Sequence, residues 1–224
     1  MFTVEEKADI RTRFLEIETS NVADVLDELG HPDQGLASDF ALQTSGGPIA
    51  GWAYTIRGQM TPYPLGGDAE KMSACAGLSD GDVSVWSGNG EGICYFGELI
   101  AIGMKERGCV GAIADGGLRD IGWLNAQLFP VMACYRTPVQ SISRWKVNAW
   151  QVPVFLRGAT TKWVAVRPGD FVLGDSDGGI VIPQEIVSTV LDQAEALTKK
   201  ERAIRKDLKN GMSLADALKQ YGHI

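Results

Sequence analysis

Amphipathic segments with helical spacing lie near both ends of the chain. Residues 3–17 and Ser20–Glu28 carry apolar side chains at the spacing of a helix and predict two N-terminal helices. Near the other end, an apolar face in the first half of Gln184–Lys209 predicts a long helix. Asn210-Gly211 should end it, and Ser213 should cap a last short helix. Helices are therefore expected at both ends of the chain.

The middle of the chain shows short apolar runs separated by Gly, Pro and Asp, a pattern typical of strands. The predicted strands are Ile49–Ile56, Asp82–Trp86, Val110–Ala114, 130–135, 152–156, 162–166, 170–174 and 179–182. The predicted loops are 60–68, 87–92 and 115–120, and the predicted short helices are Asp68–Ala76, Phe96–Arg107 and a segment ending at Leu128. This alternation predicts one α/β domain over residues 1–224.

Length and charge narrow the class of protein. The 224 residues suffice for a domain with a full core. The formal net charge of −7 argues against nucleic acid as a direct partner, because an acidic chain repels phosphate backbones. No apolar run reaches the roughly 18 residues that a bilayer requires, and Met1–Ser20 has no signal-peptide core. We therefore expect no membrane partner and a cytoplasmic location.

The number and spacing of cysteines and histidines limit the kinds of catalytic and metal site that the chain can form. The four cysteines are far apart, and no pair has the two-residue spacing of a zinc or redox motif, so reduced and mostly buried thiols are expected. The only histidines are His31, at an expected helix end, and His223, next to last. This count excludes a zinc site built on two or three histidines and argues against a Ser-His-Asp triad. Carboxylates, Arg, Lys or metal-bound water remain for acid–base work, and Mg²⁺ or Mn²⁺ as the metal.

Gly97-Glu98 begins the helix predicted over Phe96–Arg107. The free N–H groups of a first helical turn can bind an anion, so a carboxylate could rest on the amides of Glu98, Leu99 and Ile100. Every helix has such an N-terminus, and a purely structural role stays open for this one.

Arg119-Asp120 follows the apolar run Val110–Ala114 and two glycines. Ligands of open α/β sheets bind outside the carboxyl ends of strands, which is where this loop should lie. Arg119 can bind a carboxylate or keto oxygen with two parallel hydrogen bonds, and Asp120 can bind a hard cation directly or through water. A surface salt bridge between the two residues is the alternative.

The two motifs are expected to meet. Glu98 is followed by twenty residues and then by Arg119-Asp120, and a βαβ unit brings its helix start and the end of its next strand to one edge of the sheet. Two carboxylates, one arginine and a helix N-terminus would then face one cavity. Such a site suits a small acid and a metal without any histidine.

The string GELIAIGMKERGCVGAIADGGLRDIGWL, residues 97–124, resembles the signature of the RraA-like family. Thr19–Leu26, Arg167–Asp170 and Gly174–Pro183 resemble other segments of that family, so the resemblance covers about residues 17–185. The family includes class II pyruvate aldolases that act on 4-hydroxy-4-methyl-2-oxoglutarate and 4-carboxy-4-hydroxy-2-oxoadipate. It also includes protein regulators of RNase E.

The resemblance implies a fold and an assembly. The fold would be a β/β/α swivelling-type domain with a central mixed sheet and N- and C-terminal helices. A C-terminal helical extension, residues 184–224, would follow the core. The family forms trimers or hexamers with sites between subunits, so a homotrimer or hexamer is expected.

The resemblance also implies roles for residues. Arg119 would bind the pyruvate moiety, and the backbone at Gly97, Leu99 and Ile100 would receive its carboxylate. Asp120 would hold Mg²⁺ or Mn²⁺, mostly through water, and Glu98 would act through water on the same metal and on proton transfer. The aldolases usually have Asp where this chain has Glu98, a departure that bears on substrate range.

A neighbouring subunit would contribute one more acid. In this family a glutamate of the C-terminal helix reaches the metal of the next subunit. Glu201 is the best match in this chain, and Glu195 is the rival.

Three functions follow from the resemblance. The first is a metal-dependent lyase that releases pyruvate from a 4-hydroxy-2-oxo acid and also decarboxylates oxaloacetate through the same enolate. The second is another reaction on a hydroxy or oxo acid, to which the departure at Glu98 points. The third is an RNase E inhibitor without catalysis. The extension from Gln184 onward favours an enzyme, because it can supply the acid from the neighbouring subunit.

Overall fold

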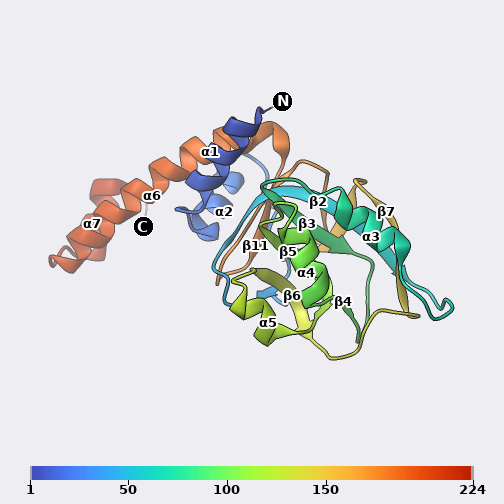
Figure 1. The fold of residues 1–224 in the computed structure, drawn as a ribbon. Helices are drawn as coiled ribbons and strands as arrows, with labels where there is room; N and C mark the ends of the chain where they lie inside the picture. Colours follow the sequence, from blue (N-terminus) through green and yellow to red (C-terminus); the bar gives the residue numbers. More distant parts are fainter. Residues whose placement is uncertain (1, 223–224) are drawn as a thin grey trace.

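A mixed β-sheet runs through the middle of the computed structural model, which describes residues 2–222 (Figure 1). Four strands form its parallel centre in the order β6-β5-β3-β2, namely β2 (Ile49–Met60), β3 (Asp82–Ser87), β5 (Gly111–Leu118) and β6 (Val131–Arg136). The short β4 (Cys94–Phe96) runs parallel to β5. Antiparallel neighbours extend the sheet with β1 (Ala41–Leu42) on β6, β7 (Trp145–Trp150) and β10 (Phe171–Gly174) on β2, and β11 (Gly179–Ile182) on β10. A separate antiparallel pair joins β8 (Val154–Arg157) to β9 (Trp163–Val166).

Two groups of helices cover one face of the sheet. The helices are α1 (Val4–Phe14), α2 (Thr19–Glu28), α3 (Ala69–Ala76), α4 (Glu98–Lys105), α5 (Ile121–Ala126), α6 (Val187–Lys209) and α7 (Leu214–Tyr221), with a 3₁₀ turn η1 (Gln184–Ile186) before α6. One group consists of α1, α2 and α6, and the other of α3, α4 and α5. Figure 1 shows α6 running past α1 and α2, with α7 at its far end. The predicted α/β fold, with a central mixed sheet and terminal helices, is confirmed. The prediction of a single domain over 1–224 stays a prediction.

Alternate residues of β2 face opposite sides of the sheet, as the two-residue period of a strand requires. Trp52 belongs to the core beneath α1, α2 and α6, and Ile56 to the core beneath α3 and α4. Ile49 and Ala53 belong instead to a core on the other side, shared with the β8–β9 pair. The sheet is thus buried on both faces, which explains the nearly continuous apolar runs of its central strands.

Local signals fix the N-terminal helices. The hydroxyl of Thr3 caps α1 while the carboxylate of Glu6 accepts from the Thr3 N–H at 2.7 Å, which is a capping box. The ring of Phe14 stacks on Phe171 with centroids 4.5 Å apart, which ties α1 to β10. Gly30, with φ of 82°, ends α2, and His31 follows it in the turn, as expected. The tail histidine, His223, lies outside the described residues.

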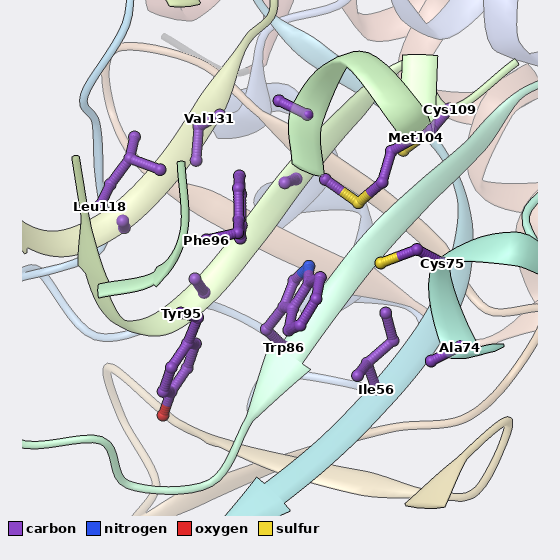
Figure 2. Packing of buried hydrophobic residues seen from close by; sticks show 14 of the residues in the cluster. Ile56, Ala74, Cys75, Trp86, Tyr95, Phe96, Met104, Cys109, Leu118 and Val131 are labelled. Carbon is purple, nitrogen blue, oxygen red and sulfur yellow. The ribbon is translucent and has the colours of Figure 1, made fainter. Parts of the chain in front are cut away.

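An aromatic cluster lies beneath α3 and α4, and Figure 2 shows part of it. Tyr95 stacks on Trp145 with centroids 4.3 Å apart, and Trp86 lies 5.2 Å from Phe96. These rings are at most 2% exposed, so they fix the position of β4, which carries Tyr95 and Phe96. The residues that follow β4 therefore start from a rigid base.

Several element boundaries differ from the prediction. The segment 115–118, expected in a loop, continues β5, because Gly116 and Gly117 leave room for the rings of Tyr95 and Tyr135. The helix expected from Phe96 starts at Glu98, because the residues before it form β4. Strand β2 continues to Met60, and β7 was not predicted at all.

The cysteines follow the expectation of free thiols. Cys75, Cys94 and Cys109 are buried, Cys134 is partly buried, and none of them is in a disulfide. Burial raises the pKa of the Cys75 thiol to about 12, so it stays protonated near neutral pH. In the part of the chain from 2 to 222, no helix has both the length and the apolar character needed to cross a membrane.

A buried carboxylate holds the loop between β3 and β4. Asp115 accepts hydrogen bonds from the Tyr95 hydroxyl, from the Ser87 hydroxyl at 3.2 Å and from the Gly88 amide at 3.1 Å. Burial, with the Asp115 charge as the next cause, raises the pKa of Tyr95, so its hydroxyl remains a donor. Asp115 is thus an internal cap rather than a free acid of the site.

We expect Asp115→Ala to lower the free energy of unfolding by about 2–4 kcal/mol, because it leaves buried donors without their acceptor. Urea denaturation followed by circular dichroism measures the change. Asp24→Ala on the exposed side of α2 is the control and should stay within about 0.5 kcal/mol of the unmodified protein. Equal unfolding midpoints for the two variants would contradict the assigned role of Asp115.

Candidate functional site

Two parallel strands bring the candidate residues to one edge of the sheet. In the β4–β5 pair, Cys94 lies opposite Gly117 and Phe96 opposite Leu118. Gly97-Glu98 and Arg119-Asp120 are the next residues on each strand, so the register itself makes them neighbours. We use the term candidate site for residues 97–100 together with 119–120.

A hydrogen bond joins the two halves of the candidate site. The backbone N–H of Glu98 donates to Oδ2 of Asp120 at 3.0 Å, and Nε of Arg119 lies 3.5 Å from the same oxygen. Asp120 has φ of 60° and ψ of 34°, a left-handed conformation that Asp adopts more readily than most residues. This backbone turn directs the carboxylate of Asp120 back toward the start of α4.

Gly97 makes the close approach possible. A Cβ added there would collide with Oδ2 of Asp120 and lie 3.0 Å from Nε of Arg119. The backbone of Gly97 is extended, with φ of −138° and ψ of −160°, so conformation alone does not demand glycine. The reason for glycine at position 97 is space for the two side chains of the neighbouring loop.

Arg119 lines two cavities. One, of about 390 Å³, is also lined by Asp120, Arg136 and Thr137. The other, of about 150 Å³, is also lined by Gly97 and Ile100. Within residues 2–222, the buried Nε of Arg119 makes no hydrogen bond, although it lies 3.5 Å from Oδ2 of Asp120 in an ion pair. A buried donor without a partner is costly, so this atom is suited to an acceptor on a ligand.

The first turn of α4 supplies backbone donors. The first intrahelical bond runs from the N–H of Ala101 to the carbonyl of Gly97 at 3.1 Å, so the amides of Leu99 and Ile100 precede the helical ladder. The amide of Glu98 is already occupied by Asp120. The side chain of Ile100 lines the smaller cavity, whereas that of Leu99 is 79% exposed. Two of the three expected amides thus remain for an anion.

The donor set is suited to a hard cation but is incomplete in one chain. Asp120 has a second oxygen, and Glu98 accepts a 3.4 Å hydrogen bond from the Gln127 side chain. Carboxylate oxygens are the ligands that Mg²⁺ and Mn²⁺ prefer. Across the described residues, no three His, Cys, Asp or Glu side chains come together as a metal-binding group. A cation at Asp120 would therefore need water or another subunit to complete its coordination.

The two glutamates proposed for a neighbouring subunit lie on α6 in different surroundings. Arg13 donates two hydrogen bonds of 2.7 Å to Glu195 and holds the pKa of its carboxyl below the usual value. Glu201 accepts a single 2.8 Å bond from Arg205. Glu201 is therefore the freer of the two, and its role in another subunit stays a prediction.

Lys71 was not among the predicted site residues, but it lies on α3 and lines the smaller cavity. Its side chain is almost completely buried, and Nζ donates to the Tyr95 carbonyl and to the Ser141 hydroxyl, both at 2.8 Å. Burial lowers the pKa of Lys71 below its ordinary value. Only the packing of α3 against β4 and β7 brings this lysine to the candidate site, so no local sequence signal could have identified it.

A comparison with known protein families shows the family to which the chain belongs. The sequence pattern of the RraA-like family, described as Aldolase/RraA, matches residues 19–181. The chain belongs to the RraA-like family. The resemblance predicted from residues 97–124 and from the flanking segments is thereby confirmed.

Individual relatives agree with this assignment. A proposed 4-hydroxy-4-methyl-2-oxoglutarate aldolase of Halalkalibacterium halodurans is 29% identical over 188 residues, which is 84% of this chain and 82% of that protein. The structure of an uncharacterized protein from Pseudomonas syringae pv. tomato has a TM-score of 0.82 at 26% identity, covering 96% of this chain and 94% of that one. RraAS2 of Streptomyces coelicolor, described as an unusual member of the RNase ES inhibitor RraA protein family, has a TM-score of 0.74 at 23% identity, covering 88% and 96% of the two chains. That last likeness concerns the fold alone.

Proposed function

We propose that this RraA-like protein is a divalent-metal-dependent lyase that cleaves a 4-hydroxy-2-oxo acid to release pyruvate. The observation that carries the proposal is the junction at the sheet edge, where the Asp120 carboxylate, the Nε of Arg119, which makes no hydrogen bond, and the first turn of α4 lie together. A hard-cation ligand and an anion-binding group side by side are what the reaction requires. The kinship with a proposed aldolase supports the same class of reaction.

In this proposal, the protein binds the substrate through its pyruvate half. Its carboxylate would accept from the amides of Leu99 and Ile100, and Arg119 would donate to the carboxylate and the keto oxygen. Asp120 directly, and Glu98 through water, would hold Mg²⁺ or Mn²⁺, with Glu201 of another subunit completing the site. A bound divalent cation supplies positive charge that stabilises the enolate.

The chain's own residues then account for the movement of charge and protons. As the C4 hydroxyl loses its proton, the bond between C3 and C4 breaks and its electron pair enters the pyruvate enolate. Arg119 donates to the oxygen that becomes negative, an interaction stronger in the transition state than in the substrate. Glu98 would orient the water that exchanges protons with the substrate. Decarboxylation of oxaloacetate produces the same enolate and would use the same groups.

The proposal predicts metal-dependent pyruvate release from oxaloacetate, from 4-hydroxy-4-methyl-2-oxoglutarate, or from both. A coupled assay with Mg²⁺, with Mn²⁺ and with EDTA measures it, and reactions with metal but no protein correct for spontaneous decarboxylation. We expect EDTA to abolish turnover and excess metal to restore it. Absence of turnover on both acids with either metal would reject the aldolase proposal.

One observation favours a second candidate, a different reaction on a hydroxy or oxo acid at the same site. The acid at position 98 is Glu, and its carboxylate accepts a 3.4 Å hydrogen bond from the side chain of Gln127, at the C-terminal end of α5. A longer side chain held in this way changes the space around the metal and the groups beyond the pyruvate half. The assay separates this candidate from the first, because both acids would then fail while metal-dependent binding of pyruvate remained.

We also propose assembly into a homotrimer or hexamer. Large apolar side chains near the candidate site are exposed in the single chain, among them Leu99 at 79% and Trp123 at 66%. A neighbouring subunit would cover them and bring its Glu201 to the metal. The cytoplasmic location and the absence of nucleic-acid and membrane partners stay predictions from the sequence.

A further inference from the structure

Lys71 carries a buried amine that forms no direct ion pair with any carboxylate of the described chain, although the charge of Asp68 acts on it from farther away. The residue is 5% exposed, yet none of the ion pairs formed within residues 2–222 includes it. Asp68 lies three residues earlier in the sequence. Its two carboxylate oxygens accept hydrogen bonds from the backbone N–H groups of Lys71 and Val147, each at 3.0 Å. A buried ammonium group without a directly paired carboxylate is costly, so an anion beside it would be stabilising.

The hydrogen bonds of Lys71 hold the amine in place without completing its contacts. Nζ donates to the Tyr95 carbonyl and the Ser141 hydroxyl and lies 5.3 Å from the centre of the Trp145 ring. An ammonium group has three N–H donors, and these two acceptors are neutral. One donor and the net charge therefore remain for a further partner.

The cavity beside Lys71 contains a second group in need of an acceptor. The same 150 Å³ space is lined by Arg119, whose buried Nε has no hydrogen-bond partner among the described residues. Burial is the main cause that lowers the pKa of Lys71. The Asp68 charge opposes it, and the Arg119 charge adds a smaller lowering effect, so the two cations are close enough to repel each other. The cavity volume of about 150 Å³ is well above the roughly 10–15 Å³ needed to hold one water molecule and leaves room for a small carboxylate.

We propose that Lys71 is a substrate-binding residue and that the cavity between Lys71 and Arg119 receives the carboxylate of the oxo acid. The buried amine of Lys71, the Nε of Arg119, which makes no hydrogen bond, and a wall formed by Gly97 and Ile100 surround this space. The anion would relieve the repulsion between the cations and accept their remaining hydrogen bonds. The proposal rests on the proposed function only for the identity of the ligand as an oxo acid.

Calorimetric titration with pyruvate and with pyruvamide tests the proposal, because the amide has the same shape without the charge. Lys71→Met should bind pyruvate about 10- to 100-fold more weakly than the unmodified protein, the loss expected for one hydrogen bond to a charged group. Binding of pyruvamide should be unchanged. The matched control is Lys162→Met, at an exposed lysine before β9, and it should leave both affinities unchanged.

Thermal unfolding without ligand separates binding from folding. Replacing a buried charge by an apolar chain of similar volume often preserves stability, so Lys71→Met should unfold no earlier than the unmodified protein. Lys71→Gln is the second variant, since its amide can still donate to Tyr95 and Ser141 without the charge, and it should show the same selective loss of pyruvate binding.

Two outcomes would overturn the proposal. One is equal pyruvate affinity in Lys71→Met, Lys71→Gln and Lys162→Met. The other is covalent attachment of pyruvate to Lys71 after borohydride reduction, which would make this lysine a nucleophile instead of an ionic partner. Because the titration requires no turnover, charge-dependent pyruvate binding that needs Lys71 would support the subsite even if no aldolase activity were found.

Discussion

Arg119→Ala should lower kcat/KM for pyruvate formation by about 10²–10³-fold, the usual effect of removing one donor to a developing oxyanion. The side chain lines both cavities of the candidate site, and its buried Nε has no partner within residues 2–222. It is therefore free to donate to the substrate at no expense to the fold. Steady-state assays with the metal at saturation measure the loss.

Two further variants test the geometry of this arginine. Arg119→Lys keeps the charge but not the planar fork, so it should recover only part of the activity. Arg107→Ala removes an exposed arginine just after α4 and should leave kcat/KM unchanged. Unchanged turnover in Arg119→Ala would place the reaction elsewhere in the molecule.

Gly97→Ala should reduce turnover by about 10²-fold or more, because displacing a catalytic group by about 1 Å is enough for such a loss. The added Cβ would occupy the position of Asp120 Oδ2, and Asp120 could move only by giving up the 3.0 Å hydrogen bond from the Glu98 amide. The extended backbone at position 97 accepts alanine, so the defect should be confined to the candidate site. The assay is paired with a metal titration, in which weaker apparent affinity is expected.

Gly103→Ala is the matched control, six residues away in sequence and in the interior of α4. A Cβ there meets no atom within 4 Å, and alanine at a helix interior should raise the free energy of unfolding by about 0.5–1 kcal/mol. Turnover should be unchanged. Similar activities for the two alanine variants would contradict the steric argument for Gly97.

The elements that the sequence predicted well are those whose environment is regular. α2 and α6 bury one apolar face against the sheet, and the central strands are buried on both sides, so local pattern and tertiary structure agree. β7 was missed because its pairing depends on a distant irregularity. The register between β2 and β7 shifts at Arg57 and Gly58, and the ring of Trp145 lies over Gly58, where any side chain would collide with it. A contact of this kind, between residues far apart in the chain, produces no periodic pattern of apolar residues in the sequence.

Some features of the candidate site could likewise be predicted from the sequence, and others could not. Gly97, Glu98, Arg119 and Asp120 could be paired from the sequence, because two strand ends on one sheet edge make neighbours of residues that are separated by twenty intervening positions. The hydrogen bond from the Glu98 amide to Asp120 could not be foreseen, since it depends on the left-handed backbone of Asp120. Lys71 could not be foreseen either, because it reaches the cavity from α3, outside the motif. The chemical roles of all these residues remain predictions.

The left-handed backbone of Asp120 also has a genetic consequence. Asparagine is the residue that replaces aspartate most easily in this conformation, and a single G-to-A change turns either aspartate codon into an asparagine codon. That change would retain the turn and an oxygen for the Glu98 amide while removing the negative charge. One nucleotide therefore separates the present loop from an equally well-folded loop with far weaker attraction for a cation.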